Sequence, residues 1–296
     1  MSERHHPVSS QVVSSQLLRD WPLPDVADGA GKGARGTVVV IGGAADTPGA
    51  VLLAGLAALR VGAGRLSLAT ADANTPALAV AVPESAVIAL PTTPDGAIGG
   101  RALDACTPLL DGAGSLVLGP GMRDPEVTRE IVRGVLESLG EETTVVLDAL
   151  ALTCGALDDG LRGRLGKRIV ATPNRTEAAF LLDGDVPDDD EQAARAVAER
   201  LGTVVAMQSC IVTPDGRAWV DQSGDSGLGT SGSGDVLAGA IAGLAARGAS
   251  PEQSAVWGAH VHAEAGERLS ARIGRLGYLA RELLDELPQV LTQLER

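Results

Sequence analysis

Residues Thr37–Ala69 read TVVVIGGAADTPGAVLLAGLAALRVGAGRLSLA, and this stretch predicts the class of fold. The β-branched run Thr37–Ile41 is typical of a buried strand. After a glycine-rich turn, the apolar residues of Gly49–Val61 recur at helical spacing, and Arg65–Ala69 returns to an extended pattern. A strand, a helix and a second strand in this order form a βαβ unit, whose strands lie parallel with a right-handed crossover.

The same alternation continues along the chain and predicts an α/β fold with a doubly wound, mostly parallel sheet flanked by helices. Beyond it, two short extended runs flank the turn sequence Pro214-Asp215-Gly216 and are expected to form an antiparallel hairpin at a C-terminal edge of the sheet. The hairpin strands are Ile211–Thr213 and Ala218–Asp221; the parallel strands are expected at Ala86–Leu90, Ser115–Leu118, Thr144–Leu147, Arg168–Ala171 and Thr203–Met207, with helices such as Val127–Leu139 and Glu191–Leu201.

The 296 residues contain no internal repeat and no Ser- or Pro-rich linker. We therefore expect a mobile N-terminal segment over residues 1–30 and a single domain over residues 31–296. The acidic stretch Asp183–Glu191 is expected to be a solvated loop before a helix.

Charge and residue usage disfavour several classes of protein. The formal net charge of −14 argues against nucleic-acid binding, which needs clustered Lys and Arg. Cys106, Cys154 and Cys210 form no CxxC pair, and His260 and His262 lie two apart on a predicted helix, so neither a disulfide framework nor a metal site is expected. There is no apolar run of 18 residues and the start is polar, which favours a cytoplasmic protein without a membrane span.

A glycine-rich loop that leads into a helix is the strongest indication of a binding site. Residues 227–248 read GLGTSGSGDVLAGAIAGLAARG. Gly229, Gly232 and Gly234 allow backbone N–H groups to approach a phosphate, and the start of the helix near Asp235 attracts an anion. Asp235 itself is open to two interpretations, as a helix cap or as a general base. Within the helix, two glycines spaced by four, at 239 and 243, are expected to allow close helix packing.

Several further motifs follow one another along the chain: VVVIGG at 38–43, PGA at 48–50, AALRVGAG at 57–64, LGPGM at 118–122, VVLDALAL at 145–152, TPNRTE at 172–177 and GTSGSGD at 229–235. In this order they resemble the ADP-dependent NAD(P)H-hydrate dehydratase family of the ribokinase-like superfamily. The resemblance covers about residues 31–288, and it implies that residues 31–296 form one ribokinase-like catalytic domain.

The resemblance implies a lyase that returns a (6S)-hydrate of NADH or NADPH to the reduced cofactor. ADP is the implied co-substrate, giving AMP and phosphate, with Mg²⁺ expected on the phosphates and Glu177 as a candidate partner for it. Phosphorylation of the ring hydroxyl, with Asp235 as the base, would supply a good leaving group. A homo-oligomer is expected. The implied substrate contacts are Ala50, Gly121, Asn174 and Asp235, and the nucleotide contacts are Gln208, Ser209, Cys210, Ile211, Gly232, Ser233 and Gly234.

The chain departs from the family pattern at three places. Asn174-Arg175-Thr176 replaces His-Pro-Gly, and the Asn amide does not titrate near neutral pH. Leu150 stands where a second Asp is common, and Gln208 stands where a Lys is usual. Two alternatives therefore stay open: a small-molecule kinase of the same fold, acting on a vitamin-precursor alcohol, and a nucleotide-binding homologue without catalysis.

Overall fold

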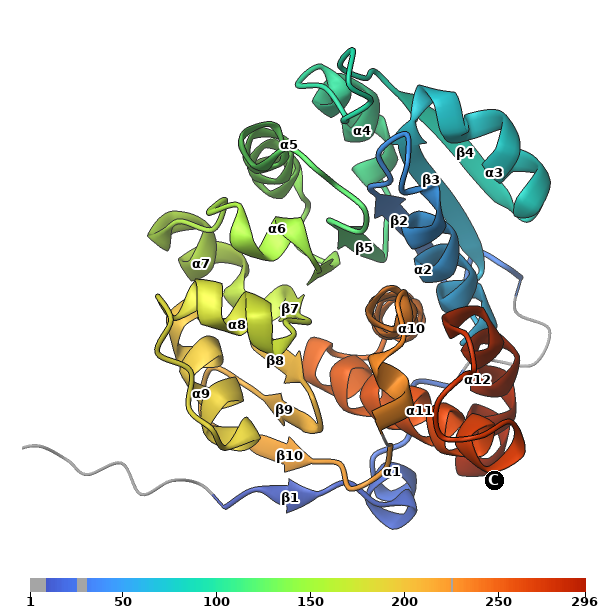
Figure 1. Cartoon of the computed structure of the whole chain (residues 1–296), viewed down its shortest axis with the longest axis vertical. Helices are drawn as coiled ribbons and strands as arrows, with labels where there is room; N and C mark the ends of the chain where they lie inside the picture. Colours follow the sequence, from blue (N-terminus) through green and yellow to red (C-terminus); the bar gives the residue numbers. More distant parts are fainter. Residues whose placement is uncertain (1–8, 26–30, 225) are drawn as a thin grey trace, which may run out of the picture.

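The computed structural model describes residues 9–25, 31–224 and 226–296, and the strands among them form one ten-stranded sheet (Figure 1). The strand order is β1-β10-β9-β8-β7-β6-β5-β2-β3-β4. The run from β4 to β8 is parallel, whereas β9 pairs antiparallel with both β8 and β10. The strands are β1 (Gln11–Val12), β2 (Thr37–Ile41), β3 (Arg65–Ala71), β4 (Ser85–Leu90), β5 (Ser115–Leu118), β6 (Thr144–Leu147), β7 (Ile169–Ala171), β8 (Val204–Met207), β9 (Cys210–Val212) and β10 (Ala218–Val220).

Helices cover both faces of the sheet, as the sequence predicts (Figure 1). In β2, Val38 and Val40 belong to one hydrophobic core, while Val39 and Ile41 belong to the other, because successive side chains of a strand point to opposite faces. The first core is covered by α2 (Pro48–Arg60), α10 (Ser233–Ala246), α11 (Pro251–Arg272) and α12 (Ala280–Leu294). Over the second lie α4 (Ala102–Leu110), α5 (Pro125–Ser138), α6 (Leu150–Thr153), α7 (Asp159–Leu165), α8 (Arg175–Leu181) and α9 (Asp190–Leu201), and α3 (Thr75–Ala81) precedes β4.

The centre of the first layer is α10, which packs closely against α2. A Cβ atom at Gly239 would come within 2.0 Å of the Ala54 carbonyl oxygen, and one at Gly243 within 2.6 Å of the Ala58 carbonyl oxygen. These positions therefore require glycine, and the predicted close packing is confirmed. Because Gly239 faces Ala54 and Gly243 faces Ala58, the two helices run in the same direction, and the loops before them lie at the same end of the sheet.

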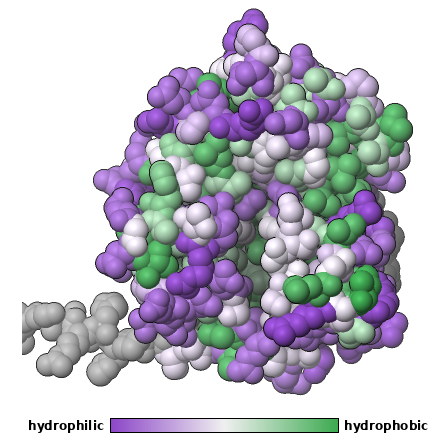
Figure 2. Space-filling model, viewed as in Figure 1, coloured by the Kyte–Doolittle hydropathy of each residue, from purple (hydrophilic) through white to green (hydrophobic). Residues whose placement is uncertain are grey.

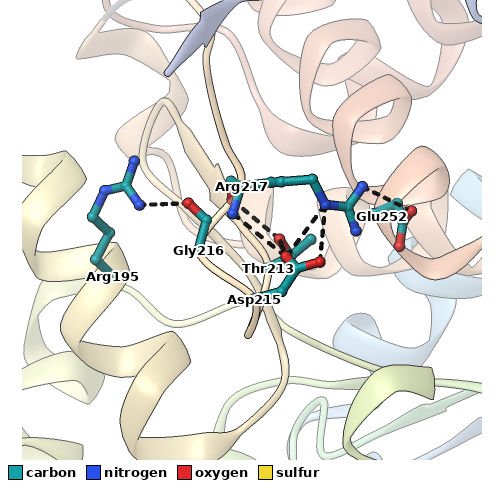
Figure 3. Close-up of polar contacts among 6 residues, drawn as sticks. All are labelled: Arg195, Thr213, Asp215, Gly216, Arg217 and Glu252. Atoms are coloured by element: carbon teal, nitrogen blue, oxygen red, sulfur yellow. Dashed lines mark hydrogen bonds and ion pairs between the residues drawn. The ribbon is translucent and has the colours of Figure 1, made fainter. Parts of the chain in front are cut away.

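The predicted hairpin is confirmed as β9–β10, and two ion pairs and a hydrogen bond hold its turn (Figure 3). The Arg217 guanidinium pairs with Asp215 at 3.0 Å and with Glu252 of α11 at 3.2 Å. On the other side, Arg195 of α9 donates to the Gly216 carbonyl oxygen at 2.7 Å. The turn is thus fixed to a helix on each face of the sheet.

The N-terminal residues differ from the expected mobile segment over part of its length. Gln11–Val12 form β1 beside β10, and α1 (Ser15–Asp20) follows. The Trp21 ring stacks on the Trp219 ring at 5.7 Å, and the Trp257 indole N–H donates to the Trp21 carbonyl oxygen at 3.0 Å. Residues 1–8 and 26–30 of the predicted segment lie outside the described residues. In the ranges that are described, every helix is too short or too polar to cross a membrane.

Candidate active site

A cavity of about 490 Å³ lies at the carboxyl ends of β7 and β8, beside the start of α10. The carboxyl edge of a doubly wound sheet is the usual place for a ligand. The face shown in Figure 2 is hollowed near its centre, where α10 lies in Figure 1. Polar groups and glycines make up most of the lining, and apolar residues such as Ala206, Leu228, Leu237, Ala259 and Ala263 complete it. The polar set includes Thr172, Asn174, Asp190, Gln208, Ser209, Asp221, Ser223, Ser226, Ser233 and His262.

The glycine loop runs directly into α10, and the predicted loop-to-helix geometry is confirmed. Gly232 is the N-cap with a φ of 88°, and a Cβ atom there would lie 2.6 Å from a Leu53 methyl group, so glycine is required. Ser233 and Gly234 follow as the first two helical residues and line the cavity. The start of a helix presents backbone N–H groups without intrahelical partners, which is the arrangement that binds a phosphate.

Asp235 is the third residue of α10 and is half-buried. Burial, and then the charge of Asp148, raise the pKa of the Asp235 carboxyl to about 7. Gly232, not Asp235, occupies the N-cap position. The arrangement therefore favours the interpretation as a general base, since a pKa near the working pH suits proton transfer.

Asp148 is a functional candidate that the sequence reasoning missed. It follows β6, is 7% exposed, and accepts a hydrogen bond from the Thr172 hydroxyl at 2.8 Å. The next residue, Ala149, has a φ of 49°, a backbone conformation that is strained for a residue with a Cβ atom. Burial raises the pKa of Asp148, and the pKa of Glu177 is raised by burial and by the charge of Asp148. A lone Asp at the end of the predicted strand 144–147 was the available signal.

Ala50 and Gly121, like Asp235, lie outside the cavity lining. Ala50 is in the first turn of α2, and Gly121 follows β5 with a φ of 66°. The Thr47 hydroxyl, at the start of α2, donates to the Gly121 carbonyl oxygen at 2.7 Å. The turn after β5 is thus held against the start of α2, which packs beside α10.

Asn174 lines the cavity and is also the N-cap of α8. Its side-chain oxygen accepts from the Glu177 backbone N–H at 2.9 Å, and the Glu177 carboxylate accepts from the Asn174 backbone N–H at 2.9 Å. This reciprocal pair is a capping box. A helix-capping role for Asn174 was not part of the sequence expectation.

The predicted nucleotide segment 208–211 divides into two parts. Gln208, with a φ of 52°, and Ser209 form the turn after β8 and line the cavity. Cys210 and Ile211 are strand residues whose side chains are buried in opposite cores, because a strand alternates its faces. Burial also raises the pKa of the Cys210 thiol. Neither residue lines the cavity, and their contact with the nucleotide stays a prediction.

The two helical histidines point in different directions, as predicted. His260 pairs with Asp221 at 2.9 Å, and His262 bonds to the Ser233 hydroxyl at 2.9 Å. Asp221 and His262 line the cavity, and sequence reasoning missed both as site residues. Over the described ranges, no group of three or more His, Cys, Asp or Glu side chains is placed to hold a metal ion.

Comparisons with known proteins agree over nearly the whole chain. Residues 38–289 match a family described as NAD(P)H-hydrate dehydratase. An ADP-dependent (S)-NAD(P)H-hydrate dehydratase of Xanthomonas campestris pv. campestris is 45% identical, over 97% of this chain and 98% of its own length. The Bacillus subtilis protein of that name is 31% identical over 92% and 95%. A bifunctional NAD(P)H-hydrate repair enzyme of Escherichia coli is 31% identical, and the chain spans about half of its length.

Solved structures show the same architecture. The ADP/ATP-dependent NAD(P)H-hydrate dehydratase of B. subtilis, co-crystallised with ATP and Mg²⁺, has a TM-score of 0.77 at 26% identity, over 97% of this chain and 99% of that one. A ribokinase-like superfamily protein of Enterococcus faecalis has a TM-score of 0.80 at 22% identity, over 99% and 100%. The expected ribokinase-like fold is confirmed.

Proposed function

The chain belongs to the NAD(P)H-hydrate dehydratase family, and from this premise we propose that it is an ADP-dependent dehydratase that restores (6S)-NAD(P)H hydrate to NAD(P)H. One observation carries the proposal. Asp235, whose carboxyl group has a pKa of about 7, is the third residue of a helix whose first two residues, Ser233 and Gly234, line a cavity. A base and a phosphate cradle within one turn suit transfer of a phosphoryl group to a hydroxyl.

The proposed reaction has two steps. Asp235 takes the proton of the ring hydroxyl, whose oxygen attacks the β-phosphorus of ADP, and AMP leaves. The C–O bond of the resulting phosphate ester then breaks, phosphate leaves, and a proton is lost from the neighbouring ring carbon, so that the ring double bond is restored. Phosphorylation is needed because hydroxide is a poor leaving group. The sum is hydrate and ADP giving NAD(P)H, AMP, phosphate and one proton.

The chain's own groups would act at defined points. The amides of Gly232–Gly234 stabilise the negative charge on the transferred phosphoryl group. Gln208 and Ser209 lie across the cavity and hold the nucleotide, while Ala50, Gly121 and Asn174 hold the hydrated cofactor. Ala50 and Gly121 lie at the start of α2 and after β5, whereas Asn174 lines the same cavity as Gln208 and Ser209.

The carboxyl groups of Asp148, Glu177 and Asp235 do not form a metal site by themselves in the described residues, but one of them could assist a divalent cation that is held mainly by phosphates. The charge of Asp148 raises the pKa of both Glu177 and Asp235, and a cation would relieve this repulsion. Mg²⁺ is usually bound by phosphates, waters and one or two carboxylates. Glu177 is the candidate ligand, and the ion would neutralise charge on the phosphates.

The test is an assay of the purified protein with hydrated NADH, Mg²⁺ and either ADP or ATP. We expect the absorbance band of NADH to return, with one AMP formed for each NADH when ADP is the donor. Release of a stable phosphorylated product without NADH would favour the small-molecule kinase. No turnover with either donor, in protein that binds ADP, would favour the non-catalytic homologue.

A further inference from the structure

Helix α11 holds the segment that leads from β10 to α10 at several polar contacts, none of which the proposed reaction uses. His260 bonds to Asp221 at the start of this segment, and the Gly224 backbone N–H donates to the Glu267 carboxylate at 2.8 Å. At its end, the His262 ring nitrogen Nε2 lies 2.9 Å from the Ser233 hydroxyl oxygen. The described ends of this segment are therefore held by α11 as well as by the sheet.

The contact between Ser233 and His262 is buried and lies at the edge of the cavity. Ser233 is 4% exposed and His262 is 7% exposed, and both line the cavity. Burial lowers the pKa of His262 to about 4, so the ring is neutral at neutral pH. A neutral ring nitrogen forms a hydrogen bond with a hydroxyl without adding charge beside a phosphate site.

Ser233 is the natural point at which to fix the first turn of α10. Its neighbours Gly232 and Gly234 have no side chains, and no side-chain hydrogen bond caps this helix in the described structure. Glycines on both sides leave the backbone with many accessible conformations. The Ser233 hydroxyl is thus the one side-chain anchor that the Gly-Ser-Gly turn offers.

We propose that His262 is a positioning residue for phosphoryl transfer, which fixes Ser233 and so aligns the amides at the start of α10 and the Asp235 carboxyl two residues later. This inference rests on the proposed function. His262 does not exchange a proton with the substrate; it acts through Ser233. Misalignment of a reacting group by about 1 Å can lower a rate by about 10²-fold.

The test compares variants at both ends of the contact. His262→Leu and Ser233→Ala remove the hydrogen bond, whereas His262→Gln keeps a polar group near the position of Nε2. Gln253→Leu is the matched control: Gln253 is also buried on α11, but it donates to the Trp21 and Pro22 carbonyl oxygens, away from the cavity. For each variant we would measure kcat, KM for ADP, ADP affinity by calorimetry, and thermal melting.

We expect His262→Leu and Ser233→Ala each to lower kcat by about 10- to 100-fold and to weaken ADP binding. His262→Gln should recover most of both, and Gln253→Leu should lower the melting temperature while kcat is unchanged. The double variant Ser233→Ala/His262→Leu should lose no more than the worse single variant, because the two groups act together.

Wild-type kcat in folded His262→Leu, or losses that multiply in the double variant, would overturn the inference. If His262→Leu does not fold, the test uses Ser233→Ala and the double variant Ser233→Ala/His262→Gln. Their kcat values should be equal, because residue 262 acts through the Ser233 hydroxyl, which both variants lack. Failure of the proposed function is distinguishable, because it appears as an inactive wild type. ADP affinity then decides the role of His262 alone: weaker binding in His262→Leu but not in Gln253→Leu supports it, and equal binding overturns it.

Discussion

The Asp235 carboxyl group lies where a negative charge is costly, because it is half-buried and because the charge of Asp148 acts on it. Replacing Asp235 with Asn keeps the shape and removes the charge. We expect turnover to fall by about 10²- to 10⁴-fold, the usual effect of losing a general base. ADP binding and the fold should remain. Turnover and melting measured on one preparation decide this, and near-normal rates in folded protein would exclude Asp235 as the base.

The same carboxyl predicts a dependence on pH. Turnover should fall as the pH drops below about 7, because protonated Asp235 cannot accept the hydroxyl proton. Stability should change in the opposite sense. The folded-state pKa lies above the ordinary value of 3.8, so the folded protein binds the proton more tightly, and this stabilisation is lost as the pH rises to about 7. The melting temperature of Asp235→Asn minus that of wild type should therefore be larger at pH 8 than at pH 5. An equal difference at both pH values would contradict the raised pKa of Asp235.

At Asn174, a substitution should affect the stability of the protein without affecting turnover. Since its side-chain oxygen caps α8, Asn174→His should lower the free energy of unfolding by about 1 kcal/mol. Turnover should persist, because the Asn amide is neither an acid nor a base. Asn174→Ser, which keeps a capping oxygen, is the control. Urea unfolding and kcat check the two effects, and loss of turnover in stable Asn174→His would contradict the proposed place of Asn174.

At the scale of elements, α10 depends on its close approach to α2. Gly239→Ala places a Cβ atom within 2.0 Å of the Ala54 carbonyl oxygen, so we expect a loss of about 1–3 kcal/mol. Alanine normally strengthens a helix, and Gly163→Ala in α7, where no atom lies within 4 Å of the new Cβ, should be neutral or stabilising. Chemical unfolding of both variants tests this. Equal changes in the free energy of unfolding of the two variants would show that packing against α2 does not decide whether alanine stabilises or destabilises.

The elements that the sequence predicted are those whose own residues show a hydrophobic period or a turn motif. The strand Thr37–Ile41 and the β9–β10 hairpin are confirmed because hydrophobic period and turn chemistry are local. Strand β1, with two residues, and α1, with six, were missed because elements so short form only against their tertiary neighbours. Contacts across the fold, such as His262 with Ser233, depend on where α11 lies beside α10. No local pattern indicates them.

At the scale of the whole molecule, the N-terminal segment covers one edge of the sheet and one end of α11. Deletion of residues 1–25 removes β1 and α1 and exposes Trp219 and Trp257, which are 5% and 1% exposed in the full chain. We expect a lower melting temperature and greater association, because buried apolar area is lost. Deletion of residues 1–8 is the control. Calorimetric melting and sedimentation measure both effects, and unchanged melting after the longer deletion would show that this segment does not stabilise the fold.

The three tryptophans of the chain gather in one corner, where Trp21 stacks on Trp219 and accepts a hydrogen bond from Trp257 through its carbonyl oxygen. Intrinsic fluorescence of this protein therefore reports on the docking of its N-terminal segment. An emission shift would record the release of Trp21 from the Trp219 ring even while the rest of the sheet stayed intact. Among the residues that the structure describes, no tryptophan lines the cavity, so we expect nucleotide binding there to leave the emission nearly unchanged, and a fluorescence titration would then not detect a ligand that binds well.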